Sequence, residues 1–344
     1  GKRLIATVGR ITGNLIIKKI AEKSANKTSN LVNMFLDDIH KRGFGLGKII
    51  RMNVQKKILT IRHLSPFMIQ HKKTFPSESY EDDFIQGLYT SLSRFIFKSI
   101  DIKVYLLSSK NKSSLLCSKQ IEQAMDIDDK IVDNFPYDVF LSSMDESSNR
   151  LFDKILSLKQ LKVNKGILTI WNVICGIFPL NIYEVTRYVA DLRSLGIKDE
   201  LFYLGLYQSE IAIKYQVDNF GMKKGEDTVK SLLNQIMFTG IKDIQIVENN
   251  HDNIKVKIED DYSLNSMEKG YAGKIGNVFV DSMVIGAISF SYDIPISDYR
   301  IEKNEKNYIL HLSRSGGKTL TEYAKGRIDN KIINMIEKGL NHKN

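Results

Sequence analysis

The chain has 344 residues, of which 42% are hydrophobic and 26% charged, and its formal net charge is +10. This length suits about two folded domains, and the ordinary apolar fraction with only five prolines excludes a largely disordered protein. Two cysteines, Cys117 and Cys175, are too few for a disulfide framework or a four-thiolate zinc site, and no basic, apolar leader opens the sequence, so a cytoplasmic protein is expected.

The front of the chain predicts two helices. An apolar stripe with helical spacing runs through residues 4–20. Leu31, Phe35 and Ile39 recur at spacing four in a second helix that begins near Lys27. The glycine cluster at 43–47 is expected to end this helix, because glycine accepts the left-handed dihedral angles of a helix C-cap.

A hairpin, a third helix and two further strands are predicted next. Strand-like alternation occupies residues 48–52 and 57–63. An apolar helical run follows from 83 to 97, and strand-like runs at 100–107 and 115–118 close this part of the chain. The predicted order is therefore helix, helix, hairpin, helix, strand, strand.

The segment from Lys119 to Asn149 contains eight acidic residues and only two lysines. Its net charge is −6, which leaves +16 on the rest of the chain. Apolar residues in the following part, up to Lys162, have helical rather than disordered character. The sequence predicts an acidic helical connector here. The scattered lysines elsewhere favour a solvated surface over a nucleic-acid interface.

The back of the chain follows the same plan as the front. Helices are predicted from about Tyr203 to Val217 and over 228–238, and a hairpin over 244–247 and 254–258. A helix and two strands then occupy 277–312.

A preface and a tail flank this second copy. Residues 166–198 predict a hairpin-like apolar run and a helix that starts near Asn181, and a helix is expected over 320–340. Because Asn172, Gly176 and Pro179 interrupt the apolar run, no membrane span is expected.

The two copies are related by an internal repeat. Asp83 aligns with Asn277 and Ser114 with Tyr308, both at an offset of 194 residues. Repeated units must form the same supersecondary structure. The expected fold is therefore α+β, a mixed α/β sandwich with two tandem antiparallel sheets, a helical connector and a C-terminal helix. The predicted parts are copy one at 1–118, the connector at 119–164, copy two at 165–313 and the tail at 314–344. Copy one lacks the preface, so it is either N-terminally incomplete or borrows that element from elsewhere.

This order of elements and its glycines resemble the 4-vinyl reductase domain family. The motifs that carry the resemblance are short, apolar and glycine-based, and lie at 9–13, 43–45 and 84–87 in copy one and at 179–196, Gly205 and Gly240 in copy two. The resemblance implies a fold similar to TRAPP-complex core subunits and to nitric-oxide-sensing haem domains, which encloses a hydrophobic small molecule. Many members carry cysteines near the final strands, whereas here only Cys117 falls there and copy two has His311.

Copy two contains most of the side chains suited to such a pocket. The candidate ligand-pocket residues are Trp171, Cys175, Phe178, Phe202, Tyr207, Phe279, Met283 and Phe290. For each of these residues taken individually, core packing is favoured over a role in a pocket. Copy two is the expected ligand site and copy one the expected surface for a protein partner or a second copy of the chain.

Other chemistry is less well supported. The stretch 313–319 ends like a phosphate-binding loop at Gly316–Thr319. The full motif requires a glycine five residues before Gly317, and that position is occupied by Leu312. A flexible joint is therefore favoured. No two of the six histidines have the i, i+4 spacing of a helical metal site, and no Gly-x-Ser-x-Gly elbow is present. No metal, cofactor or catalytic residue is predicted.

The leading hypothesis is a non-enzymatic sensor or regulatory or assembly module that binds an apolar small molecule. Ligand burial would favour one arrangement of the two copies, which a partner then recognises. A nucleic-acid-binding regulator that uses the basic surface is the alternative. A nucleotide-dependent enzyme that uses Gly316–Thr319 is a third hypothesis.

Overall fold

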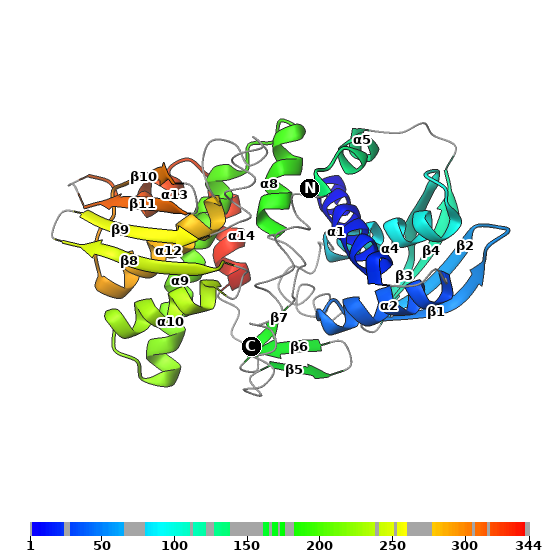
Figure 1. Cartoon of the computed structure of the whole chain (residues 1–344), viewed down its shortest axis with the longest axis horizontal. Coiled ribbons are helices and arrows are strands. Elements are labelled where there is room, and N and C mark those ends of the chain that lie inside the picture. Colours follow the sequence, from blue (N-terminus) through cyan, green and yellow to red (C-terminus); the bar gives the residue numbers. More distant parts are fainter. Residues whose placement is uncertain are drawn as a thin grey trace. The chain divides into compact units, whose positions relative to one another are not determined.

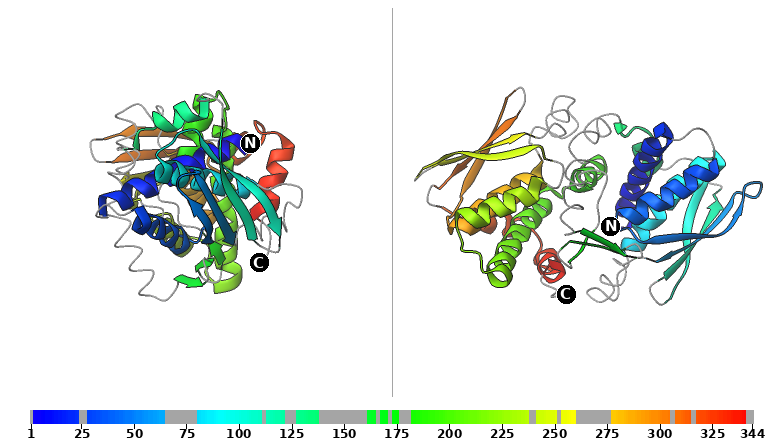
Figure 2. Two further views of the ribbon diagram at one scale, coloured as in Figure 1. Left: turned by 90° about the vertical axis from the view of Figure 1, so that its right-hand side faces the viewer. Right: turned by 60° about the horizontal axis from the view of Figure 1, so that its bottom comes forward.

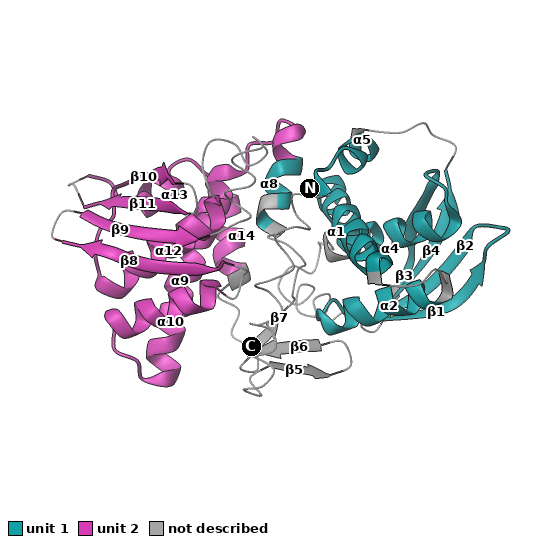
Figure 3. Cartoon of the chain, in the orientation of Figure 1, with its two compact units in different colours: residues 1–141, 153–189 teal, residues 142–152, 190–344 magenta. Residues whose placement is uncertain are grey.

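The chain was analysed as a computed structural model, which divides into two compact units (Figures 1 and 3). Unit 1 comprises residues 1–141 and 153–189, and unit 2 comprises 142–152 and 190–344. The residues that the structure describes are 2–23, 28–64, 80–110, 113–121, 127–137, 161–164, 167–170, 173–175, 182–237, 241–250, 253–259, 277–304, 307–314 and 317–340.

Unit 1 contains a four-stranded antiparallel sheet with the strand order β1-β2-β4-β3. Its main elements are α1 (Lys2–Lys23), α2 (Thr28–Lys41), β1 (Leu46–Asn53), β2 (Ile58–Leu64), α4 (Tyr80–Phe97), β3 (Ile102–Lys110), β4 (Ser113–Gln120) and α5 (Ile127–Asp133). Helices α1, α2 and α4 lie together beside the sheet (Figure 2). Alternate strand residues such as Leu59, Ile61 and Leu116 are buried with Phe35 and Tyr89 of the helices. The core therefore lies between the helices and one face of the sheet.

Unit 2 repeats this topology in the order β8-β9-β11-β10. Its elements are α9 (Lys198–Phe220), α10 (Glu226–Met237), β8 (Asp243–Asn249), β9 (Asn253–Glu259), α12 (Val278–Tyr292), β10 (Asp298–Lys303), β11 (Tyr308–Ser313), α13 (Leu320–Lys325) and α14 (Asn330–Leu340). The helix, helix, hairpin, helix, strand, strand order occurs in both units. The predicted α+β fold class with two similar antiparallel units is confirmed.

Gly43 and Gly45 follow the end of α2 with positive φ, as expected, whereas Gly9 and Gly205 lie where two helices cross. A Cβ atom added at Gly9 of α1 would lie 2.2 Å from the carbonyl oxygen of Phe84 in α4. A Cβ added at Gly205 of α9 would likewise lie 2.7 Å from the carbonyl oxygen of Phe279 in α12. Gly205, which the family resemblance places at a turn, is thus in a helix, where the missing side chain lets two backbones meet.

At each helix crossing a serine of one helix packs against a glycine of the other, but the helix that carries the serine differs between the two units. In unit 1, Ser91 of α4 lies against Gly13 of α1 and donates a 2.7 Å hydrogen bond to a backbone carbonyl of α1. In unit 2 the serine is on the first helix, because Ser209 of α9 lies against Gly286 of α12 and donates a 2.8 Å bond to a carbonyl of α12. Both units thus use one small residue and one serine at this level.

A smaller sheet and a further helix correspond to the predicted preface. Strands β5 (Leu161–Asn164), β6 (Ile167–Ile170) and β7 (Val173–Cys175) pair in sequence order, and α8 (Ile182–Leu192) follows. The division between units 1 and 2 falls at residues 189 and 190, within α8. The domain bounds proposed from the sequence remain predictions.

The tail of unit 2 forms two helices where the sequence predicts one. Helix α13 ends at Lys325, and Gly326 donates its N–H to the carbonyl oxygen of Glu322. Helix α14 is joined to α9 because Glu337 accepts a 2.6 Å hydrogen bond from the Tyr203 hydroxyl. Of the connector, α5 and the ends are described, and 138–160 lies outside the described residues. Among the helices described here, none has the length and apolar character to cross a membrane.

Candidate functional site

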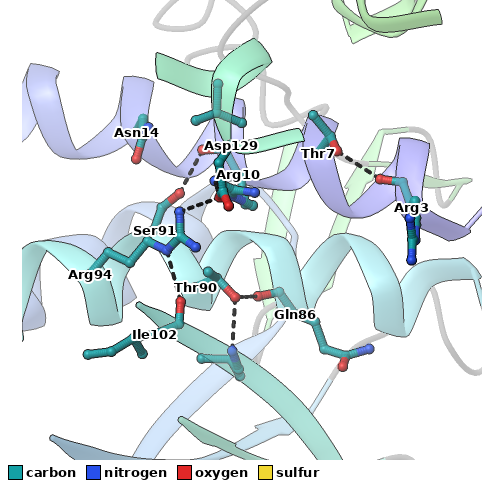
Figure 4. A network of polar contacts seen from close by, with 12 residues as sticks. Arg3, Thr7, Arg10, Asn14, Gln86, Thr90, Ser91, Arg94, Ile102 and Asp129 are labelled. Atoms are coloured by element: carbon teal, nitrogen blue, oxygen red, sulfur yellow. Dashed lines mark hydrogen bonds and ion pairs between the residues drawn. The ribbon is translucent and has the colours of Figure 1, made fainter. Parts of the chain in front are cut away.

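A buried cluster of charged side chains lies where α5 packs against α1 and α4 in unit 1 (Figure 4). Asp129 of α5 places one carboxylate oxygen, Oδ1, 2.5 Å from Nη2 of Arg10 and 2.8 Å from Nη1 of Arg94. The side chains of Asp129 and Arg10 are only 5% and 6% exposed. Two guanidinium groups therefore share one buried carboxylate.

Backbone and hydroxyl groups hold the two arginines in place (Figure 4). Arg94 donates from Nε to the carbonyl oxygen of Ile102 on β3 at 2.8 Å, which ties the cluster to the sheet. The hydroxyl of Ser91 donates to the carbonyl of Arg10. Because desolvated charges cost several kcal/mol unless they are paired, Asp129 is the residue that makes both buried arginines tolerable.

A cavity of about 300 Å³ lies beside this cluster. Its lining residues come from α1, α4, α5 and the turn before β3: Arg10, Asn14, Ile17, Lys18, Ala21, Ser91, Arg94, Phe95, Ile100, Val132 and Asp133. Three of these side chains are cationic and one is a carboxylate. Nη2 of Arg94 is buried and has no hydrogen-bond partner among the described residues. Arg94 therefore contributes to the cavity wall, and its Nη2 atom is buried behind that wall without a described partner.

One wall of the cavity is fixed by Tyr137. Its hydroxyl donates to the carbonyl of Val132 and accepts from Asn14 Nδ2, each at 2.9 Å. Burial raises the pKa of this phenol, so the ring remains neutral. The ammonium group of Lys18 lies 4.5 Å from the ring centroid, a cation–π distance. A small molecule with a negative group and an apolar body matches this combination of donors and aliphatic wall.

A second buried polar pair in unit 1 has a structural role. His63 on β2 places Nε2 2.9 Å from the carbonyl oxygen of Phe44 and Nδ1 2.9 Å from the Tyr89 hydroxyl. The carbonyl only accepts, so Nε2 carries the proton and Nδ1 accepts from Tyr89. Burial lowers the pKa of His63 from 6.5 to about 4, so the ring is neutral at pH 7.

This histidine predicts an acid-sensitive unit 1. An unfolded histidine takes up a proton below pH 6.5, whereas the folded His63 does so only near pH 4. The free energy of unfolding should therefore fall by up to about 3 kcal/mol between those two values and change no further below them on account of this group. Urea unfolding measured across this range tests the effect. H63Q should lack this component, and an unchanged pH profile in H63Q would contradict the assignment.

Unit 2 has a corresponding helix-to-sheet hydrogen bond built from other residues. Tyr308 of β11 donates to Oδ1 of Asp281 in α12 at 2.8 Å, and both residues are fully buried. An aspartate in the first turn of a predominantly apolar helix is the sequence signal that could have revealed it. Arg10 and Arg94, cations within apolar helical stripes, carry the same kind of signal for the cluster in unit 1.

Five of the eight candidate pocket residues belong to the packed helix layer of unit 2. Phe202 stacks on Tyr299, with 5.4 Å between ring centroids, and Tyr207 stacks on Tyr203 at 5.8 Å. The remaining three of this group are on α12, with Phe279 and Met283 buried and Phe290 half-buried. None of these five lines the cavity of unit 1.

The other three candidates cannot be compared with a site. Trp171 and Phe178 lie outside the described residues. Cys175 ends β7, and its side chain also lies outside the described set. A pocket formed by the eight residues stays a prediction.

The stretch that resembles a phosphate-binding loop ends as a helix cap. Thr319 accepts a hydrogen bond from the Glu322 backbone N–H, and the Glu322 carboxylate accepts one from the Thr319 N–H at 2.8 Å. This capping box uses the amide that a phosphate would need, and it places a carboxylate there. Within the described ranges, no three His, Cys, Asp or Glu side chains are grouped as metal ligands would be.

Comparison of the chain with protein families, with curated proteins and with solved structures finds no match. The resemblance to the 4-vinyl reductase domain family therefore remains a proposal.

Proposed function

We propose that the chain is a non-enzymatic regulatory module, with tandem units resembling 4-vinyl reductase domains, whose unit 1 binds a small organic anion. The observation that carries this proposal is the buried Nη2 of Arg94, which has no partner among the described residues and belongs to a side chain on the cavity wall. The sequence favours an apolar ligand in copy two, whereas these donors favour a carboxylate or phosphate attached to an apolar body. Phe95, Ile100 and Val132 supply the apolar wall.

The regulatory step would be competition at the arginines. The Asp129 carboxylate forms ion pairs that join α5 to both Arg10 and Arg94. A ligand anion that binds Arg94 weakens the attraction between α5 and the rest of unit 1. The ligand then shifts the population of docked and released α5, by its difference in affinity for the two states.

Thermal unfolding with benzoate and with benzyl alcohol tests the ligand class. Benzoate should stabilise the full chain by about 1.4 kcal/mol at ten times its Kd, and benzyl alcohol by less, because only benzoate carries the charge. Native mass spectrometry of the purified chain should detect benzoate binding at one site.

An exposed residue on the cavity wall supplies the matched variants. Ala21 lines the cavity near the end of α1, and its neighbour Glu22 is exposed and does not line it. A21W should remove the benzoate effect without changing the unfolding temperature of the free chain much, and E22W should keep it. Equal stabilisation by the two ligands, or an undiminished benzoate effect in A21W, would refute the proposal.

A further inference from the structure

The outer face of the sheet in unit 1, opposite the helices, is strongly basic. Arg62 of β2 is exposed between buried Ile61 and buried His63, so it points away from the core. Lys48 of β1 is its direct cross-strand partner and therefore shares that face. By the same alternation, Lys103 of β3 points outward.

The four strands of this sheet contain six cations and no Asp or Glu. The cations are Lys48, Arg51, Arg62, Lys103, Lys110 and Lys119. The corresponding strands of unit 2 contain four Lys or Arg and five Asp or Glu. Ion pairs neutralise that second sheet, such as Lys255–Glu248 at 2.5 Å and Lys257–Glu259 at 2.7 Å. The units share a topology, so the charge difference is specific to unit 1 and is not imposed by the fold.

Like charges face one another on this surface. Lys48 of β1 is opposite Arg62 of β2 in antiparallel register. Directly opposed like charges destabilise a sheet. A bound polyanion would remove this repulsion. The opposed cations therefore destabilise the free sheet but favour a complex with a polyanion.

Three described carboxylates of unit 1 have contacts away from the exposed cations of β1 and β2. Asp129 is engaged with Arg10 and Arg94 at the helical side of unit 1. Asp133 lines the cavity there. Asp101, at the start of β3, pairs with Lys57 of the β1–β2 turn.

An aromatic ring and aliphatic side chains lie among the cations. Tyr105 of β3 is 40% exposed and shares a cross-strand row with Cys117, Thr60 and Arg51. A register shift next to it leaves Leu107 60% exposed. Bases stack on exposed aromatic rings, while lysine and arginine side chains follow the phosphates.

We propose that the outer face of the β1-β2-β4-β3 sheet binds single-stranded nucleic acid. The phosphates contact Arg51, Arg62 and Lys48, and a base stacks on Tyr105. A four-stranded sheet face is too broad to enter a duplex groove, which admits a helix or a two-stranded ribbon. The bases of a single strand are free to lie flat on the sheet, so the surface favours single strands over duplexes.

Fluorescence anisotropy of the full chain with a labelled oligo-dT of about 20 nucleotides, at several KCl concentrations, tests this proposal. The double variant R51Q/R62Q should weaken binding by about tenfold or more and reduce the slope of log K against log salt by about 1.4, because each single-strand phosphate contact contributes about 0.7. The control R300Q/K303Q removes two exposed cations from β10 of unit 2 and should bind as the unaltered chain does.

A third variant separates stacking from charge. Y105L should weaken binding by about fivefold or more with the salt slope unchanged, because it removes a ring and no cation. An unchanged affinity in R51Q/R62Q would overturn the proposal, as would tighter binding to a duplex of the same length. Vesicles of phosphatidylserine and phosphatidylcholine that bind the chain when oligo-dT does not would also overturn it, in favour of a membrane surface.

Discussion

Replacing Asp129 by asparagine is expected to destabilise unit 1 by about 3–5 kcal/mol. Asparagine keeps the size of the side chain but leaves two buried guanidinium groups without their shared carboxylate, whose Oδ1 lies 2.5 Å from Arg10 and 2.8 Å from Arg94. Hydrogen exchange of the α1 and α4 amides during urea unfolding measures this loss within unit 1. The exchange should accelerate in both helices, because each carries one of the arginines.

The control for this variant is D37N on α2 of the same unit. Asp37 also accepts from a cation, Lys41 Nζ at 2.7 Å, but both side chains are more than half exposed. Exposed ion pairs contribute about 0–1 kcal/mol, so D37N should leave unfolding nearly unchanged. Equal effects of D37N and D129N would mean that the cluster is not the buried charge centre of unit 1.

The order of elements could be predicted because it depends on local periodicity. Period-two alternation identifies both hairpins, and period-3.6 stripes identify α1, α2, α9 and α10. The internal repeat then shows which elements of the first copy correspond to which elements of the second copy. Local periodicity alone does not give this correspondence. The strand order within each sheet was not predicted, but the equal element orders of the two units do form the same strand order.

The charged cluster could not be predicted in the same way. Arg10 and Asp129 are 119 positions apart, and their pairing depends on how α5 packs against α1. In the sequence, Asp129 is one of eight acidic residues between Lys119 and Asn149 and is indistinguishable from solvated neighbours. Burial of a charge is a tertiary property, and only a cation within an apolar stripe, such as Arg10, hints at it.

The C-cap role of the glycines at 43–47 was predicted from the sequence, but the helix-contact role of other glycines was not. Gly9 and Gly205 interrupt apolar stripes, which is equally typical of a turn and of a helix contact. The structure shows that both glycines are in helix contacts, because a carbonyl oxygen of the partner helix occupies the space that a side chain would need. A sequence reading that compared small residues on the two predicted helices of each copy would have favoured the contact.

Replacing Gly9 by alanine should therefore destabilise unit 1 by about 3–5 kcal/mol, although alanine is the better helix former by about 1 kcal/mol. The new Cβ would lie 2.2 Å from the carbonyl oxygen of Phe84, so α1 and α4 must separate. Urea unfolding measures the loss. At Gly196 a Cβ would meet nothing within 4 Å, so G196A should change stability by less than about 1 kcal/mol. A stabilised G9A would show that α1 and α4 do not approach this closely in solution.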